Sequence, residues 1–332
     1  MTTISQVARE AGYSPATVSR FLNNRIELPA STALRIDAAV ARLGYRPNLL
    51  ARRLSTGRTE TIGLVAPEIS NPFFAKLAAT IEDEAELHGY SVLMSSTRGA
   101  REREITYLRR LEDRHVDGLI MMTNEPDDGT LAKCIDTHSN VVLVDEDVPG
   151  VAVPKIFVEN EYGAYLATRH LIGAGHTGIA HIGGPRDLMS VRERMDGYLR
   201  ALREDKMEPA LSRVLLGSYS REFGAAAIDR ILSDTDRPTA MFCGSDIVAT
   251  GVMQRLRERG LNVPDDISVV GFDDMPFADM LAPALTTVRQ PIETLGRKAF
   301  RDLYALINKQ ETVAEERLPV SLVERKSVAR RS

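Results

Sequence analysis

The segment before residue 55 is the part of the chain that most narrows what it can fold into. Thr3 and Gln6 have the spacing of a capping box, in which a hydroxyl and an amide satisfy free backbone N–H groups at a helix start. Gly12 ends this helix with a tight turn, and Ser14-Pro15 caps a second helix with proline at its first position. Two short helices joined in this way predict a helix-turn-helix.

The second of these helices has one apolar and one polar face. Val18, Phe21 and Leu22 can pack it onto the first helix, which leaves small and polar residues on the other side. Small residues at its start would let the helix enter a major groove, where Arg20 can contact a guanine through two hydrogen bonds. The candidate DNA contacts in these helices are Ser5, Ser14, Pro15, Ala16, Thr17, Ser19, Arg20 and Asn23.

Charge distinguishes this segment from an ordinary helical hairpin, which is the alternative interpretation. Residues 1–58 contain nine arginines, no lysine and three acidic residues, a net charge of +6. The whole chain has a formal net charge of -4, so the remaining residues have a net charge of -10. A basic segment attached to an acidic body favours contact with nucleic acid phosphates.

These motifs resemble those of the LacI/GalR family of bacterial transcription regulators. The likeness includes T-I-x-x-V-A-x-x-A-G-x-S-x-x-T-V-S-R, then L-G-Y-x-P-N, then A-R-x-L. It continues in family order through Ile69–Phe74, Val116–Ile120, Arg194–Tyr198, Val269–Asp274 and Leu285–Pro291. The chain departs from the family pattern at Pro29 and Ala33, where a capping serine and an arginine are usual, and at Arg53 in the A-R-x-L segment.

By this resemblance, residues 48–55 form a hinge helix on DNA. A helix of this length is marginal in water by itself. The resemblance implies that the paired hinges of a dimer become helical on the operator, and that Leu54 enters the minor groove and unstacks a flexible base step. Asn48 and Arg52 are the other candidate contacts of the hinge, and the alternative role for Leu54 is a helix core residue.

Apolar strand-like runs alternate with helical patterns from Thr61 onward, which predicts parallel sheets with helices on both faces. The resemblance implies a two-lobed α/β effector domain of the type I periplasmic-binding-protein kind after the all-α helix-turn-helix domain. We expect residues 1–58 to be the DNA-binding domain, hinge included, and residues 59–332 to be the effector-binding and dimerisation core. The expected N-lobe comprises about 60–159 and 291–318, and the C-lobe about 160–290 and 319–332. The final strand is expected at Val320–Val323, followed by a charged segment that frays.

Ligands of open α/β sheets bind beyond the carboxyl ends of the strands. Loops at these positions carry carboxylates, an arginine and aromatic rings, which suit the paired hydroxyls and faces of a sugar. Matched to the family, the candidate effector contacts are Glu68, Phe73, Phe74, Arg194, Tyr219, Ser245, Asp246, Asp273 and Gln290. Structural roles remain alternatives, because Phe73 can be a core residue and Asp246 can cap the following helix.

The motifs do not indicate an enzyme, a catalytic residue, a metal site or a cofactor. Gly173–Gly178 fits G-x-G-x-x-G, but a helical pattern precedes it and a strand follows, whereas a dinucleotide loop follows a strand and opens a helix. The six histidines lack metal-ligand spacing. Cys134 and Cys243 lie in apolar segments and are expected to be reduced, and no signal peptide or membrane span is recognised, which favours a cytoplasmic protein.

The sequence therefore predicts a homodimeric repressor of carbohydrate-metabolism genes. Its partners would be double-stranded DNA, as a pseudo-palindromic operator, and a small effector, a sugar or sugar derivative, in the cleft between the lobes. A purine is the alternative effector. A solute receptor without a regulatory role is disfavoured by the basic N-terminal segment, and a purely architectural DNA-binding protein by the polar residues gathered at strand ends.

Overall fold

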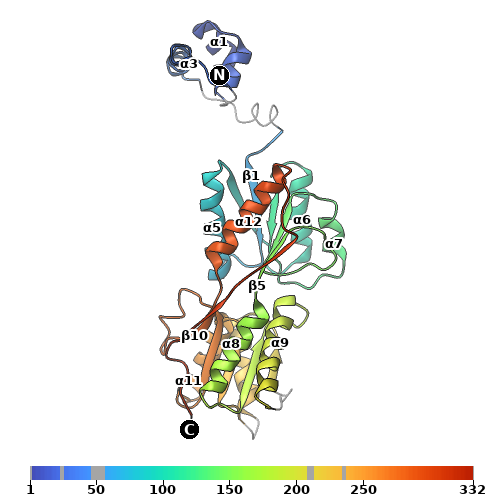
Figure 1. The fold of residues 1–332 in the computed structure, drawn as a ribbon, viewed down its shortest axis with the longest axis vertical. Helices are drawn as coiled ribbons and strands as arrows, with labels where there is room; N and C mark the ends of the chain where they lie inside the picture. Colours follow the sequence, from blue (N-terminus) through green and yellow to red (C-terminus); the bar gives the residue numbers. More distant parts are fainter. Residues whose placement is uncertain (1, 23–25, 46–56, 208–212, 234–236, 332) are drawn as a thin grey trace. The chain divides into compact units, whose positions relative to one another are not determined.

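The computed structural model describes residues 2–22, 26–45, 57–207, 213–233 and 237–331. Their contacts divide the chain into two compact units, Met1–Thr59 and Glu60–Ser332. Figure 1 shows the helices of the first unit and the two sheets of the second. Each unit is described separately below.

The N-terminal unit contains α1 (Ile4–Ala11), α2 (Pro15–Leu22) and α3 (Ala30–Leu43). The backbone N–H of Thr3 donates to Gln6 Oε1 at 2.8 Å, and α1 ends at Gly12, whose φ is 77°. Ser14 Oγ accepts from the backbone N–H of Thr17 at 3.1 Å, so it caps α2. The small core consists of Val7, Ala8, Ala11, Val18, Ile36 and Ala39. The predicted helix-turn-helix is confirmed.

The second unit begins with a six-stranded sheet in the order β11-β5-β4-β3-β1-β2, here called the N-lobe sheet. All of its pairings are parallel. Its strands are β1 (Thr61–Ala66), β2 (Ser91–Ser96), β3 (Leu119–Met121), β4 (Val141–Val144), β5 (Lys155–Val158) and β11 (Glu315–Leu318). One face packs against α5 (Pro72–Leu87) and α12 (Ile292–Ile307), and the other against α6 (Arg101–Glu112) and α7 (Thr130–Ile135).

A second six-stranded sheet, the C-lobe sheet, has the order β12-β10-β9-β8-β6-β7. Its strands are β6 (Ile179–Gly183), β7 (Val214–Leu216), β8 (Ala240–Cys243), β9 (Ser268–Asp273), β10 (Thr286–Arg289) and the antiparallel β12 (Ser321–Val323). One face packs against α8 (Asn160–Gly173) and α9 (Met189–Glu204), and the other against α10 (Arg221–Leu232) and α11 (Asp246–Glu258). The predicted α/β architecture with mostly parallel sheets is confirmed.

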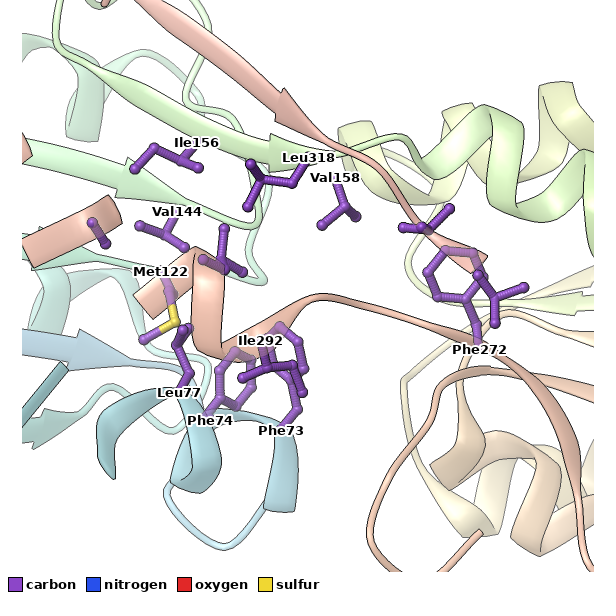
Figure 2. Close-up of a cluster of buried hydrophobic side chains, with 14 of the residues drawn as sticks. Phe73, Phe74, Leu77, Met122, Val144, Ile156, Val158, Phe272, Ile292 and Leu318 are labelled. Atoms are coloured by element: carbon purple, nitrogen blue, oxygen red, sulfur yellow. The ribbon is translucent and has the colours of Figure 1, made fainter. Parts of the chain in front are cut away.

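The chain passes between the two sheets after β5, after β10 and after β11. Apolar side chains from both sheets belong to one continuous cluster around these passages. Figure 2 shows Phe73 and Phe74 beside Ile292, and Phe272 apart from them. The two lobes therefore share part of their hydrophobic core.

Some local predictions need correction. The strand β11 and the short helix α7 were not predicted, and the expectation that the last residues fray is wrong for 324–331. Ser327 is fully buried and its hydroxyl donates to the carbonyl of Val269 at 2.5 Å, while the N–H of Arg331 donates to the carbonyl of Ala174 at 2.7 Å. Hydrogen bonds of this kind hold the segment against β9 and the end of α8 in the C-lobe.

The interpretation of the glycine-rich segment is confirmed. Gly173 ends α8, Gly175 has a φ of 89° and β6 starts at Ile179, so the G-x-G-x-x-G segment is a helix end followed by a strand. Both cysteines are free thiols; Cys243 is buried in β8 and Cys134 is half-buried in α7. Within the part of the chain that is described, no helix has the length and apolar character needed to cross a membrane.

Candidate functional site

The candidate DNA interface is the outer face of the helix-turn-helix. Ser5, Ser14, Pro15, Ala16 and Arg20 are exposed, and Thr17 and Ser19 are half-buried. Ser14 also serves as the cap of α2, and its hydroxyl lies 2.8 Å from that of Thr17. The structure thus leaves seven of the predicted contacts wholly or partly exposed. Asn23, Asn48, Arg52 and Leu54 lie outside the described residues.

The candidate effector site is a cavity of about 420 Å³ between the two lobes of the second unit. Eight of the nine predicted effector contacts line it: Glu68, Phe73, Phe74, Arg194, Tyr219, Ser245, Asp273 and Gln290. They come from loops and helix starts after β1, β6, β7, β8, β9 and β10. The rule that ligands bind beyond the strand ends therefore locates most of the lining.

Arg194 in α9 is the best-anchored side chain of the cavity. It is 4% exposed, its Nε donates to Asn160 Oδ1 at 2.9 Å, and its Nη1 donates to the carbonyl of Gly244 at 2.6 Å. The guanidinium carbon lies 3.8 Å from the centre of the Phe272 ring, within range of a cation–π interaction. A buried charge is costly unless it is hydrogen-bonded and paired with an opposite charge. Arg194 meets both conditions, because its Nη1 also lies 3.9 Å from Asp273 Oδ1.

Asp273 closes the far end of β9 in a backbone conformation that is unusual for aspartate. Its φ is 115°, a region that costs a non-glycine residue about 1–3 kcal/mol. Its Oδ1 accepts from Gln290 Nε2 at 2.7 Å. Burial raises the pKa of Asp273 to about 6, with Arg194 opposing the shift. The conformation turns a carboxylate toward the cavity and holds it there.

Asp246 is the one predicted effector contact that does not line the cavity. It is fully buried at the start of α11, where Oδ1 accepts from Thr287 Oγ1 at 2.6 Å and Oδ2 accepts from the backbone N–H of Met275 at 2.7 Å. Burial and the nearby Asp273 carboxylate raise the pKa of Asp246. Asp246 therefore supports the loop that follows β9, and with it the position of Asp273.

Aromatic groups form the apolar part of the lining. Phe73 and Phe74 are mostly buried, and their rings meet edge to face with centroids 5.2 Å apart. They belong to the shared core as well as to the cavity wall, so Phe73 is a core residue that also faces the cavity. Burial raises the pKa of Tyr219 to about 12, which keeps its hydroxyl protonated.

Sequence reasoning missed several polar residues of the lining. Asp145 and Glu146 follow β4, and Thr123 and Asn124 follow β3, so the strand-end rule would have found all four. Ser190 at the start of α9 also lines the cavity. Two buried acceptor atoms here, Asn124 Oδ1 and Gln290 Oε1, have no hydrogen-bond partner within the described chain. Such atoms are suited to donors carried by a ligand.

Comparisons with known proteins agree with this architecture. A model of bacterial regulatory proteins of the lacI family matches residues 3–48, and one of a periplasmic binding protein-like domain matches residues 168–328. The HTH-type transcriptional repressor PurR of Vibrio atlanticus (strain LGP32) is 35% identical over 313 residues, which cover 94% of this chain and 93% of the relative. The chain belongs to the lacI family of bacterial regulatory proteins.

Solved structures of similar proteins cover both units. The lac repressor dimer bound to operator and the anti-inducer ONPF matches with a TM-score of 0.87 at 31% identity, over 99% of each chain. A complex of the transcriptional regulator CelR with cellobiose matches with a TM-score of 0.75 at 30% identity, over 98% of this chain and 100% of the other. The protein is thus a DNA-binding transcriptional repressor of this family, and its named relatives are regulators rather than enzymes.

Proposed function

We propose that the protein is a homodimeric repressor whose operator affinity is controlled by a sugar or sugar derivative bound in the cavity between the lobes. The observation that carries this proposal is the set of acceptor and aromatic groups around the fixed guanidinium of Arg194. An effector that binds one arrangement of the lobes more tightly than another must shift the equilibrium between them, and operator affinity changes by the same linkage.

The chemistry of the lining supports a sugar. Sugar hydroxyls are hydrogen-bond donors, and the cavity offers them the carboxylates of Glu68, Asp145 and Asp273 together with the orphan oxygens of Asn124 and Gln290. The phenylalanine rings can pack on an apolar sugar face. The cellobiose complex of the similar regulator is a precedent for such a ligand. Control of carbohydrate-metabolism genes is the corresponding proposal for the regulated targets.

A purine is the second candidate because Phe73, Phe74 and Tyr219 supply aromatic surfaces on which a base can stack. Isothermal titration calorimetry of the purified protein with neutral sugars in one series and purines in another separates the two candidates. Saturable binding by a sugar, lost in Tyr219→Ala and accompanied by altered operator affinity, supports the proposal. Binding by purines alone would replace the sugar with a base.

For DNA, we propose that residues 1–58 are the binding domain and that the exposed face of α2 reads the major groove of each half-site. Residues 59–332 would then bind effector and dimerise, with lobes at about 60–159 plus 291–318 and 160–290 plus 319–332. The exposed Met280, beside the half-buried Phe277 and Leu281, is an apolar surface suited to a second copy. The dimeric lac repressor is the precedent for this assembly.

Operator binding by substituted proteins tests the proposed DNA contacts. Leu54→Ala is expected to weaken operator binding and leave effector affinity unchanged, because the proposed contact of Leu54 in the minor groove is made to DNA alone. Arg20→Ala is expected to cost about 1–3 kcal/mol at one base position. Leu34→Ala, which removes an exposed leucine from α3, is the control. Unaltered operator affinity in Leu54→Ala would exclude insertion of Leu54 into the minor groove. An equal loss for all DNA sequences in Arg20→Ala would mean that Arg20 contacts only phosphate.

A further inference from the structure

Glu146 joins the two lobes through hydrogen bonds to the start of α9. It follows β4 of the N-lobe sheet and is 3% exposed. Oε1 accepts from the backbone N–H of Met189 at 2.5 Å, and Oε2 accepts from the backbone N–H of Ser190 at 3.2 Å and from Ser190 Oγ at 2.7 Å. Oε1 also accepts from the N–H of Asp147 at 3.2 Å. The carboxylate is therefore fully engaged by the protein.

The start of α9 would otherwise be suited to an anion. The first N–H groups of a helix lack internal partners, and the helix dipole favours negative charge there. The α9 helix is 16 residues long, its N-cap Leu188 provides no side-chain acceptor, and its first turn contains no acidic residue. Leu188 and Ser190 both line the effector cavity. The carboxylate of Glu146, supplied by the opposite lobe, takes the place of the missing cap.

Other charges of the cavity do not compensate for an anionic ligand. The lining contains five carboxylate side chains, those of Glu68, Asp145, Glu146, Glu222 and Asp273, and two guanidinium groups, those of Arg194 and Arg221. Arg194 already donates to Asn160 and Gly244, while Arg221 donates to Gln254 Oε1 at 2.9 Å. Part of each guanidinium is thus already engaged, and the carboxylates of the lining outnumber the guanidinium groups five to two, so a phosphate or carboxylate entering here would meet mainly negative groups.

We propose that Glu146 determines effector specificity: its carboxylate occupies the helix terminus that an anionic substituent would need, so the cavity admits uncharged effectors and rejects phosphorylated or carboxylated ones. This inference rests on the proposed effector site. In this proposal a single residue distinguishes an uncharged sugar or base from the same compound with a phosphate or carboxylate group. Removal of the carboxylate should convert the start of α9 into an anion site.

Calorimetric titration of inorganic phosphate into the full-length protein tests this proposal. We choose pH 8, above the value of about 7 to which burial raises the pKa of Glu146. Wild-type protein is expected to show no saturable binding, whereas Glu146→Ala should bind phosphate saturably, at least roughly tenfold more tightly than the weakest affinity that the titration detects, because charge-assisted bonds from the freed N–H groups become available. Glu68→Ala removes one negative charge from the same cavity without uncapping α9, and it should resemble the wild type.

Two outcomes would overturn the inference: phosphate binding by the wild type, or an equal gain in Glu146→Ala and Glu68→Ala. If Glu146→Ala does not fold, as judged by thermal unfolding, Glu146→Gln keeps the side-chain volume, removes the charge and one of the two acceptor oxygens, and should show a smaller gain in phosphate binding. Neutral sugar titrated into the wild type separates the two proposals. Sugar binding without a phosphate gain contradicts the specificity role alone, and absence of any sugar or purine binding contradicts the effector site itself.

Discussion

The two walls of the cavity differ in how firmly their polar groups are held. On the C-lobe wall, Arg194 is fixed by Asn160 and Gly244, and Asp273 by Gln290. On the N-lobe wall, Glu146 is held by the start of α9, whereas Asn124 Oδ1 has no partner among the described residues. Gln290 Oε1, on the C-lobe wall, also has no partner there. Groups that are already fixed need little reorganisation when a ligand binds, whereas free groups gain a partner from it. We infer that the C-lobe wall orients the effector and the N-lobe wall responds to it.

Arg194→Ala is expected to have the largest effect, because it removes the most firmly held polar side chain of the C-lobe wall. We expect effector affinity to fall roughly 100-fold and the free energy of unfolding to fall by about 3 kcal/mol, since the buried Asp273 carboxylate loses its counter-charge. Calorimetry and chemical denaturation measure the two effects. Arg200→Ala, on the exposed side of the same helix, is the control. Normal effector affinity in Arg194→Ala would show that Arg194 does not contribute to effector binding.

Glu104 in α6 is a buried carboxyl of the N-lobe that does not line the cavity. This carboxyl is 1% exposed beside Thr123, and burial raises its pKa to about 7 from 4.5. Because the folded protein holds the proton more tightly than the unfolded chain, this group's contribution to stability is complete below pH 4.5 and is lost as pH rises through 7.

Glu104→Gln should therefore be more stable than the wild type at pH 8, by about 2 kcal/mol, and should lose most of that advantage at pH 5. Denaturation at both pH values gives the difference, and Glu102→Gln on the exposed face of α6 is the control. An equal advantage at the two pH values would mean that Glu104 does not titrate in this range.

Asp145→Asn is expected to give the smallest effect. The half-buried side chain lines the cavity, and burial raises its pKa to about 6. Its removal should weaken effector binding roughly tenfold through loss of one charged acceptor, and should leave the melting temperature unchanged or slightly higher. Calorimetry and thermal unfolding on the same sample measure both. A large drop in melting temperature would show that the N-lobe wall is as firmly built as the C-lobe wall.

Local patterns in the sequence predict most of the fold. The helix-turn-helix follows from caps and a glycine turn within 20 residues, and buried parallel strands such as Val141–Val144 are continuous apolar runs. The strand β11 is Glu-Glu-Arg-Leu at the edge of its sheet, so its composition gives no strand signal. The segment 324–331 looks like a frayed end, and it is ordered by hydrogen bonds to residues about 60 positions away in sequence.

The sequence predicts where the site lies and most of its lining residues, but not the hydrogen bonds between them. Strand ends locate the lining, yet nothing local tells that Asp246 turns inward to Thr287, 41 residues away, while its neighbour Ser245 faces the cavity. The partners of Glu146 are 43 and 44 positions distant, and they depend on how the two lobes meet. Hydrogen bonds between residues so far apart in sequence can be identified only from the three-dimensional structure.

The order of strands in the two sheets has a consequence for synthesis of the protein. The N-terminal unit has its whole core within residues 7–39, so it can fold while the rest of the chain is still being translated. Neither large sheet is complete before β11 and β12 have left the ribosome, because each contributes a final strand to one of them. During translation, the DNA-binding helices of a nascent chain should therefore fold well before its effector cavity can form. For an interval, the cell contains chains with folded DNA-binding helices and no effector cavity.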